Sequence, residues 1–400
     1  MKEIVIIGGG ASGMAAAIRA AENPEYHVTL LERQTRVGRK LLSTGNGRCN
    51  LTNTEADPEC YHGEESGFVV PALTKYPPAR VLEFFRELGL KTVTEYGGRV
   101  YPMSDHAGSV LDVLRLGMEQ RSVTVCTGVS AVELRYSGSG FLIVTDREQL
   151  RADCVIVACG GCAGSKLGGV MDGYNLLKQL GHSRTALYPA LTQLRTAPDY
   201  PRALKGIKCD CGLRLMKGER VLAETSGDVL FTENGLSGTA VFALSRAASG
   251  TEGLTASLRL FPETADELLT ELQARRERWQ TQPANSILTG TVQSRLGQML
   301  CKYAGISGGT CIAALTDGQL SALARAMTDF RLPITGVSGF EAAQVTAGGI
   351  KTSEFRAETM ESRLVPGLYA CGEVLDVDGD CGGFNLQWAW ASGLLAGELG

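Results

Sequence analysis

The chain begins with an unbroken apolar run that predicts a buried strand. Residues 2–7 carry only isoleucine and valine after the first two positions, and a run without alternation is typical of a strand covered on both faces. Small, strongly helix-forming residues follow from Met14 to Ala21, and a second apolar run covers Val28 to Leu31. The order strand, helix, strand indicates a unit of a parallel α/β sheet.

Further apolar runs predict strands over 151–157 and 367–370, a strand and turn over 122–134, and a helix over 79–88. The strand over 151–157 ends on a glycine pair, and the strand over 367–370 leads to glycines and then to a helix that opens at 384–390. The last segments therefore repeat the arrangement seen at the start of the chain.

The middle of the chain has a different pattern. Residues 191–262 form short strand-like runs separated by Gly, Asp and Pro, which favours a small barrel or sandwich. From 263 the period becomes helical: Thr264 with Glu267, and Thr316 with Gln319, have the spacing of capping boxes that start helices. We expect a β-rich insert followed by a helical one.

The first turn has the spacing of a dinucleotide fingerprint. Glycines at G-x-G-x-x-G positions permit a tight turn, close approach of backbone to a pyrophosphate and close packing of helix on strand, while the helix N-terminus offers free N–H groups. An acid ends the second strand, where a carboxylate can accept both ribose hydroxyls. The residues are Gly8, Gly10, Ala11, Ser12, Gly13 and Glu32. A turn that binds no phosphate is the alternative.

The fingerprint alone does not separate FAD from NAD, and the loop at 33–53 favours FAD. It is basic and then rich in Gly, Asn and Thr, which suits a segment lying along an extended cofactor. Its basic side chains can neutralise phosphates, and Asn50 can hydrogen-bond a flavin ring. A solvated surface loop is the alternative. The candidate residues are Arg39, Lys40, Gly47, Arg48, Cys49 and Asn50.

Two later strand ends supply further candidates. Gly160 and Gly161 follow the strand over 151–157 and suit a close pass along the adenosine half of a cofactor. At the far end, a helix N-terminus aimed at the flavin would stabilise negative charge on the reduced ring. An ordinary C-terminal helix with Trp388 and Trp390 as core is the alternative. The candidates there are Gly372, Glu373, Gly383, Phe384, Asn385 and Leu386.

The composition of the chain limits the classes of function that we expect. The chain has 400 residues, 44% hydrophobic and 20% charged, with a net charge of −4. Without a basic stripe we expect no nucleic-acid partner, and without a long apolar run or leader we expect a cytoplasmic protein with no membrane contact. The twelve cysteines are scattered far from the four histidines, so we expect reduced thiols and no metal. Cys159 and Cys162 have CxxC spacing, so a redox-active pair formed by these two residues stays an alternative.

Long motifs in these segments resemble the bacterial NAD(P)/FAD-dependent oxidoreductase family of the aminoacetone oxidase and BaiN (bile acid dehydro-reductase-like) type. They are GRKLLSTGNGRCNLTN at 38–53, GRVYP at 98–102, VTAGG at 345–349, TMES at 359–362 and the stretch from Gly367 to Gln387. The resemblance covers nearly the whole chain.

The resemblance implies how FAD is held. Ser12 and Gly13 would contact the pyrophosphate and Glu32 the ribose. Cys49 and Asn50 would lie near the flavin, the backbone of Val129 would meet the adenine, and Glu373, Asn385 and Leu386 would close the site. Two departures from the family pattern are Cys159 in place of Thr and, within 230–239, Glu233 and Thr239 in place of His and Pro. The second puts the substrate in doubt more than the cofactor.

The expected fold is α/β: a Rossmann-like FAD-binding domain of the glutathione-reductase-like flavoprotein kind over 1–190 and 336–400. It is interrupted by the β-rich subdomain over 191–262 and the helical subdomain over 263–335. We expect an oxidoreductase that passes a hydride between the flavin and a small organic substrate or NAD(P)H, the latter a transient donor because no second fingerprint is present. Glu95, Arg99 and Tyr101 could face the cleft, but no catalytic residue is assigned.

Two other functions stay open at this point. One is a thiol–disulfide oxidoreductase that uses Cys159 and Cys162, and the other is a tRNA-modifying or non-enzymatic flavoprotein.

Overall fold

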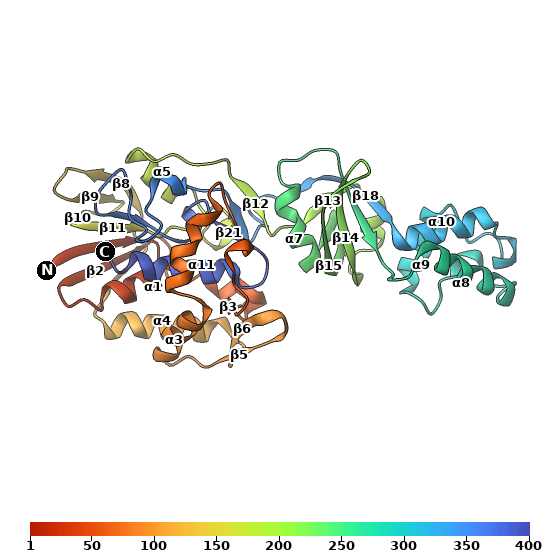
Figure 1. The fold of residues 1–400 in the computed structure, drawn as a ribbon, viewed down its shortest axis with the longest axis horizontal. Coiled ribbons are helices and arrows are strands. Elements are labelled where there is room, and N and C mark those ends of the chain that lie inside the picture. Colours follow the sequence, from red (N-terminus) through yellow and green to blue (C-terminus); the bar gives the residue numbers. More distant parts are fainter. The chain divides into compact units, whose positions relative to one another are not determined.

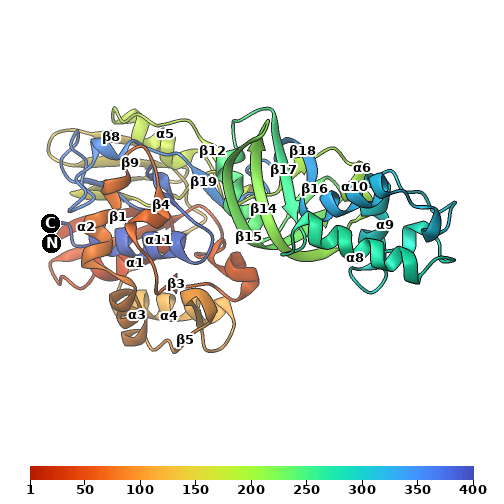
Figure 2. The ribbon, with the colours of Figure 1, turned by 45° about the vertical axis from the view of Figure 1, so that its right-hand side comes forward.

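The computed structural model describes residues 1–400, which fold into two compact units. Unit 1 comprises 1–188 and 343–400, and unit 2 comprises 189–342. Figures 1 and 2 show each unit with its elements labelled. None of the helices combines the length and the apolar composition that a membrane span requires.

Unit 1 is built on a five-stranded parallel sheet in the order β20-β11-β1-β2-β7. The strands are β1 (Lys2–Ile7), β2 (Tyr26–Glu32), β7 (Thr124–Thr127), β11 (Cys154–Val157) and β20 (Leu368–Ala370). Ile4 and Ile6 are fully buried, so the predicted buried strand is confirmed. Because the strands are parallel, the turns after β1, β2, β11 and β20 all lie at one edge.

Helices α1 (Ala11–Ala20) and α11 (Phe384–Ala396) pack against each other (Figure 1). Two glycines four residues apart permit the close approach: a Cβ on Gly393 would lie 2.4 Å from the oxygen of Ser12, and one on Gly397 2.6 Å from that of Ala16. The first and last helices of the chain therefore form one core with the sheet.

Smaller elements complete unit 1. Two antiparallel sheets have the orders β10-β9-β8 and β3-β6-β5, and β21 pairs with β4. The strands are β3 (Thr52–Asn53), β4 (Tyr61–His62), β5 (Thr92–Thr94), β6 (Arg99–Pro102), β8 (Ala131–Tyr136), β9 (Phe141–Thr145), β10 (Gln149–Ala152) and β21 (Asp378–Gly379). The helices are α2 (Val70–Lys75), α3 (Pro78–Glu87), α4 (Ala107–Gln120) and α5 (Asp172–Gln179). Two short strands occur near the boundary between the units, β12 (Tyr188–Ala190) and β19 (Val345–Ala347).

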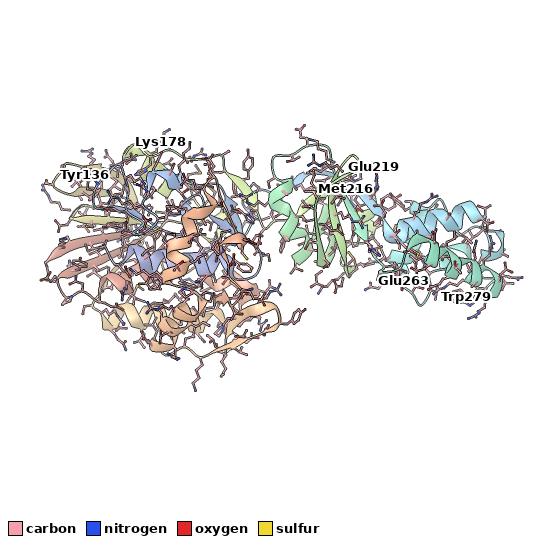
Figure 3. All side chains as sticks on the ribbon, in the orientation of Figure 1. Tyr136, Lys178, Met216, Glu219, Glu263 and Trp279 are labelled. Atoms are coloured by element: carbon pink, nitrogen blue, oxygen red, sulfur yellow. The ribbon has the colours of Figure 1, made fainter.

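Unit 2 contains a closed barrel in the order β13-β16-β15-β14-β17-β18. Its strands are β13 (Leu194–Thr196), β14 (Lys208–Lys217), β15 (Arg220–Thr232), β16 (Gly235–Ser237), β17 (Leu254–Arg259) and β18 (Phe330–Val337). The last strand, β18, follows the helices in sequence and pairs with both β13 and β17. Glu219, labelled in Figure 3, lies in the turn after β14, and its carboxylate accepts hydrogen bonds from Arg331 of β18 at 2.8 and 3.0 Å.

The helices of unit 2 are α6 (Asp199–Ala203), α7 (Thr239–Ala248), α8 (Ala265–Arg278), α9 (Ser294–Tyr303) and α10 (Asp317–Thr328). Both predicted capping boxes are confirmed: Thr264 with Glu267 starts α8, and Thr316 with Gln319 starts α10. In each, the threonine accepts a backbone N–H and the longer side chain accepts the N–H of the threonine, which satisfies two otherwise free donors.

Candidate functional site

The turn between β1 and α1 is shaped by its glycines. Gly8 has φ of 114°, and its N–H donates to Leu31 at 2.8 Å. A Cβ on Gly13 would lie 1.9 Å from the oxygen of Gly8, whereas one on Gly10 would meet nothing within 4 Å. Gly8 and Gly13 are therefore required by packing, and Gly10 lies against open space at the helix N-terminus.

Glu32, at the end of β2, is fixed beside this turn. Its Oε2 accepts the N–H of Gly9 at 2.9 Å and its Oε1 accepts the N–H of Gln34 at 2.7 Å. Val129 is buried next to it and donates its N–H to the backbone oxygen of Glu32 at 3.0 Å. The carboxylate thus has one orientation, with acceptor capacity left for a ligand hydroxyl.

The loop after β2 is held in unusual backbone conformations. Gly45, Asn46, Gly47 and Cys49 all have positive φ. Cys49 is fully buried, and this burial raises the pKa of its thiol to about 12. The Oδ1 atom of Asn50 is buried without a hydrogen-bond partner in the protein. A buried acceptor without a donor is costly, and a ligand N–H group would satisfy it.

Lys40 and Glu373 bring the two ends of the chain together. Lys40 Nζ lies 2.8 Å from Glu373 Oε2, while Glu373 Oε1 accepts the N–H of Thr346 at 2.8 Å. A Cβ on Gly161 would lie 2.5 Å from Thr346 Oγ1 and 2.6 Å from Glu373 Oε1. Three of the sequence candidates therefore meet at one place, around Thr346. That threonine lies in the 345–349 motif, and the sequence alone assigns it no role at the site.

Arg39 and Arg48 are engaged elsewhere. Arg39 Nη1 donates to Gln34 Oε1 at 2.8 Å. Arg48 forms ion pairs with Glu95, at 2.5 Å, and with Asp105, and its guanidinium lies 4.0 Å from the centre of the Tyr101 ring. The structure thus shows what Glu95 and Tyr101 contact: the side chain of Arg48.

The turn after β20 and the start of α11 adjoin the first turn and the basic loop. A Cβ on Gly372 would lie 2.6 Å from Ser12 Oγ, and one on Gly383 would lie 2.9 Å from Asn50 Oδ1. The side chain of Asn385 is hydrogen-bonded to the backbone of Gly379. Its Oδ1 atom accepts the N–H of Gly379 at 2.8 Å, and its Nδ2 atom donates to the oxygen of Gly379 at 2.7 Å. Its side chain is therefore committed to shaping this turn.

The neighbouring residues at the start of α11 differ in exposure. Phe384 and Leu386 are half-buried, and the backbone oxygen of Phe384 accepts the hydroxyl of Tyr61 at 3.1 Å. Trp388 and Trp390 are core residues whose Nε1 atoms donate to the oxygens of Gly372 and Leu51 at 3.2 and 2.9 Å. Most of α11 is therefore buried in the core, and only its first turn borders the candidate site.

Cys159 and Cys162 do not pair with each other. Cys159 Sγ donates to the oxygen of Ile7 at 3.4 Å, and Cys162 Sγ lies 3.0 Å from Met171 Sδ. Burial raises the pKa of both thiols, so both are protonated near neutral pH and are poor nucleophiles. All twelve cysteines are free thiols.

A parallel sheet with a glycine turn, a helix N-terminus over open space and a fixed carboxylate on the next strand defines a Rossmann-type dinucleotide-binding fold. The whole chain, from 2 to 399, matches the family described as HI0933-like protein Rossmann domain, and it belongs to that family. The family expected from the sequence motifs and the expected fold class are confirmed.

Two relatives have assigned activities. The chain is 40% identical over 404 residues to the 3-dehydro-bile acid delta(4,6)-reductase of Clostridium scindens, covering all of this chain and 98% of that one. It is 30% identical over 394 residues to the ribosomal RNA dihydrouridine synthase of Escherichia coli, covering 98% and 96% of the two chains. The chain is thus an FAD-dependent oxidoreductase.

Among solved structures, the 3-ketosteroid delta1-dehydrogenase of Sterolibacterium denitrificans, in complex with 1,4-androstadiene-3,17-dione, has a TM-score of 0.52 to this chain at 13% identity. The likeness covers all of this chain and 99% of that one. At this identity the likeness concerns the fold.

The residues present fit FAD. Gly10 leaves room for a pyrophosphate, Glu32 is oriented for a ribose, and Asn50 Oδ1 is a buried acceptor without a donor. These three features suit the pyrophosphate, the ribose and the ring system of FAD, respectively.

Proposed function

We propose that this protein is an FAD-dependent reductase that uses NAD(P)H to reduce a carbon–carbon double bond conjugated to a ketone in a small, largely apolar substrate. The observation that carries the proposal is the 40% identity, over the whole chain, to a 3-dehydro-bile acid delta(4,6)-reductase. The names of both relatives describe the same kind of step, because dihydrouridine is uridine with two hydrogens added across a ring double bond next to a carbonyl.

FAD, when bound, supplies hydride chemistry that no side chain can perform. The chain's own residues position it. Gly8, Gly10 and Gly13 shape the pyrophosphate turn at the N-terminus of α1, and Glu32 holds the ribose. Asn50 offers its buried Oδ1 to a ring N–H, and Gly383 keeps the backbone close beside it.

Lys40 and Glu373 would close the site from the two ends of the chain. Their ion pair holds the basic loop against the turn after β20, and its positive end would stabilise negative charge on a reduced cofactor bound beside it. The net reaction adds one hydride and one proton to the double bond, and NAD(P)H becomes NAD(P)⁺. Because the sequence carries one dinucleotide fingerprint, the nicotinamide would bind transiently.

The test uses the purified full-length protein under anaerobic conditions, with NADH or NADPH and a 3-oxo bile acid that carries 4,6 double bonds. The proposal expects loss of the substrate's conjugated absorbance and a product heavier by two hydrogens for each NAD(P)H consumed. Consumption of NAD(P)H only when oxygen is admitted, with the steroid unchanged, would indicate an oxidase and contradict the proposed substrate.

A second candidate is reduction of uridine in RNA, which the 30% identical relative favours. It contests the expectation that no nucleic acid is bound, and that expectation stays a prediction. The net charge of −4 gives the chain no excess of phosphate-binding cations. Incubation with NADPH and unmodified ribosomal RNA decides between them: formation of dihydrouridine would support the RNA candidate, and RNA left unchanged would remove it.

A further inference from the structure

Tyr174, on α5, has a buried hydroxyl that forms no well-aligned hydrogen bond within the protein. The residue is 2% exposed. A phenol can both donate and accept, and burying it unpaired costs free energy. Nothing in the sequence singles out Tyr174, because a tyrosine within a helix is most simply a core residue.

Contacts around Tyr174 place it at the Glu373 end of the candidate site. Burial raises the pKa of the Tyr174 phenol, and the nearby carboxylate of Glu373 raises it further. Tyr174 is a neighbour of Thr346, whose N–H donates to Glu373 Oε1 at 2.8 Å and whose Oγ1 would lie 2.5 Å from a Cβ on Gly161.

Thr346 is the neighbour that could have paired with Tyr174. A hydrogen bond from Thr346 lowers the pKa of the phenol in part, but the two hydroxyls are too poorly aligned for this contact to satisfy the Tyr174 hydroxyl. Thr346 Oγ1 is already an acceptor, for the N–H of Ala163 at 3.0 Å. The raised pKa keeps the phenol protonated near neutral pH, so it is available as a donor.

We propose that the Tyr174 hydroxyl donates a hydrogen bond to an acceptor atom on the riboflavin half of bound FAD. This inference rests on the proposed function, because it requires that FAD is the ligand of unit 1. It adds to the site a residue from α5, an element that contributed none of the sequence candidates.

The variant Tyr174→Phe removes the hydroxyl alone. Thermal unfolding of the full-length protein in a series of FAD concentrations gives both the stability without added FAD and the dissociation constant. A ligand that binds only the folded state stabilises it by RT ln(1 + [L]/Kd), so the midpoint keeps rising with FAD concentration. Tyr369→Phe is the matched control. Tyr369 is also buried, but its hydroxyl donates to the oxygen of Gly400 at 3.3 Å.

We expect Tyr174→Phe to weaken FAD binding by about threefold to tenfold, the worth of one neutral hydrogen bond. Its midpoint without added FAD should equal or exceed that of the unaltered protein, because an unpaired buried hydroxyl has been removed. Tyr369→Phe should bind FAD as tightly as the unaltered protein.

Unchanged FAD binding in Tyr174→Phe would overturn the inference. So would a lower midpoint without added FAD, since it would show that the hydroxyl is bonded within the protein, to Thr346. If the unaltered protein itself shows no FAD-dependent shift, the proposed function fails, and the two failures are distinguishable.

Discussion

Lys40 and Glu373 are 333 positions apart in the chain and form an ion pair with 2.8 Å between Nζ and Oε2. The pair joins the loop after β2 to the turn after β20, at the edge of the sheet where the turns after β1 and β11 also lie. Glu373 has a second role, because its Oε1 atom accepts the N–H of Thr346. Substituting each partner alone should therefore change the free energy of unfolding by different amounts.

Glu373→Ala should lower the free energy of unfolding more than Lys40→Ala. The lysine and glutamate side chains are 33% and 20% exposed, and a part-exposed pair contributes about 1 kcal/mol or less. Removing the glutamate also leaves the N–H of fully buried Thr346 without its acceptor, which costs about 1–3 kcal/mol. Urea unfolding of both variants measures the difference. Equal losses would show that the N–H of Thr346 does not depend on Glu373.

Gly10→Ala and Gly13→Ala separate a binding role from a packing role. A Cβ at residue 10 meets nothing within 4 Å, whereas one at residue 13 would lie 1.9 Å from a backbone oxygen. Gly13→Ala should therefore lose about 1–3 kcal/mol of stability or more. Gly10→Ala should keep its stability and lose FAD affinity, because the methyl group occupies the space for the pyrophosphate.

The measurement is thermal unfolding with and without FAD. Gly318→Ala serves as a control, because its Cβ would meet only Thr316 Oγ1 at 3.9 Å, in unit 2. FAD affinity retained in Gly10→Ala would place the cofactor elsewhere.

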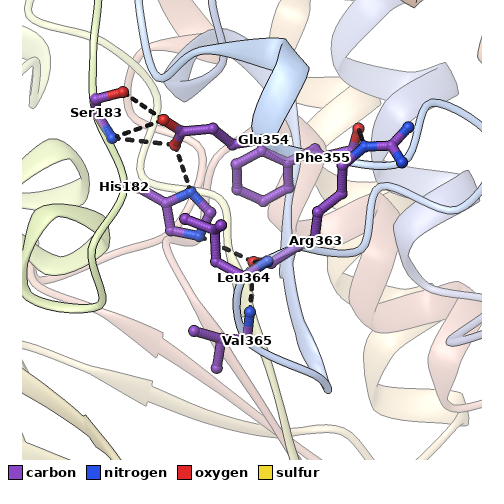
Figure 4. A network of polar contacts seen from close by, with 8 residues as sticks. His182, Ser183, Glu354, Phe355, Arg363, Leu364 and Val365 are labelled. Carbon is purple, nitrogen blue, oxygen red and sulfur yellow. Dashed lines mark hydrogen bonds and ion pairs between the residues drawn. The ribbon is translucent and has the colours of Figure 1, made fainter.

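Stability should fall on acidification because of a buried network around His182 (Figure 4). Ser362 Oγ accepts the N–H groups of Leu364 and Val365, each at 3.0 Å, so its single proton is donated to His182 Nε2 at 3.0 Å. His182 Nδ1 then carries the proton donated to Glu354 at 2.8 Å. This arrangement requires a neutral imidazole, and burial lowers the pKa of His182.

The pH window follows from these directions. A histidine with a lowered pKa in the folded state contributes stability that is fully present above its ordinary value of 6.5 and is lost as the pH falls below it. Burial acts to raise the pKa of Glu354, but hydrogen bonds from Ser183 and His182 lower it overall. Its contribution is lost below its ordinary value of 4.5.

We expect the free energy of unfolding to decrease between about pH 7 and about pH 5, and to decrease less in His182→Gln, which is less stable at neutral pH but cannot titrate. Urea unfolding at several pH values measures both. The same slope in the two proteins would show that other groups are responsible.

Substitution of the cysteines tests the thiol–disulfide alternative. Both Cys159 and Cys162 have raised pKa values and separate hydrogen-bond partners. Cys162→Ala and Cys159→Ser should therefore retain the rate of NAD(P)H-dependent reduction. Loss of turnover in either variant, with FAD still bound, would restore the thiol mechanism.

Local signals in the sequence predicted local structure well. The apolar run at 2–7, the glycine turn after it and the capping boxes at 264 and 316 each depend on residues close in the chain, and each is confirmed. The contacts that polar side chains make could not be predicted in the same way, because their partners can lie far away in the sequence. Arg48 looked suited to a phosphate and pairs with Glu95 and Asp105, and Asn385 binds the backbone of Gly379. Tyr174 carried no local signal at all.

The most direct test of the central claim is the visible absorption spectrum of the purified full-length protein, recorded anaerobically before and after addition of NADH and NADPH. We predict that the spectrum shows flavin bands and that these bands bleach when at least one of the two nicotinamides is added. Denaturation of the protein should release the flavin as FAD. A protein that carries no flavin and takes up no added FAD would contradict the account.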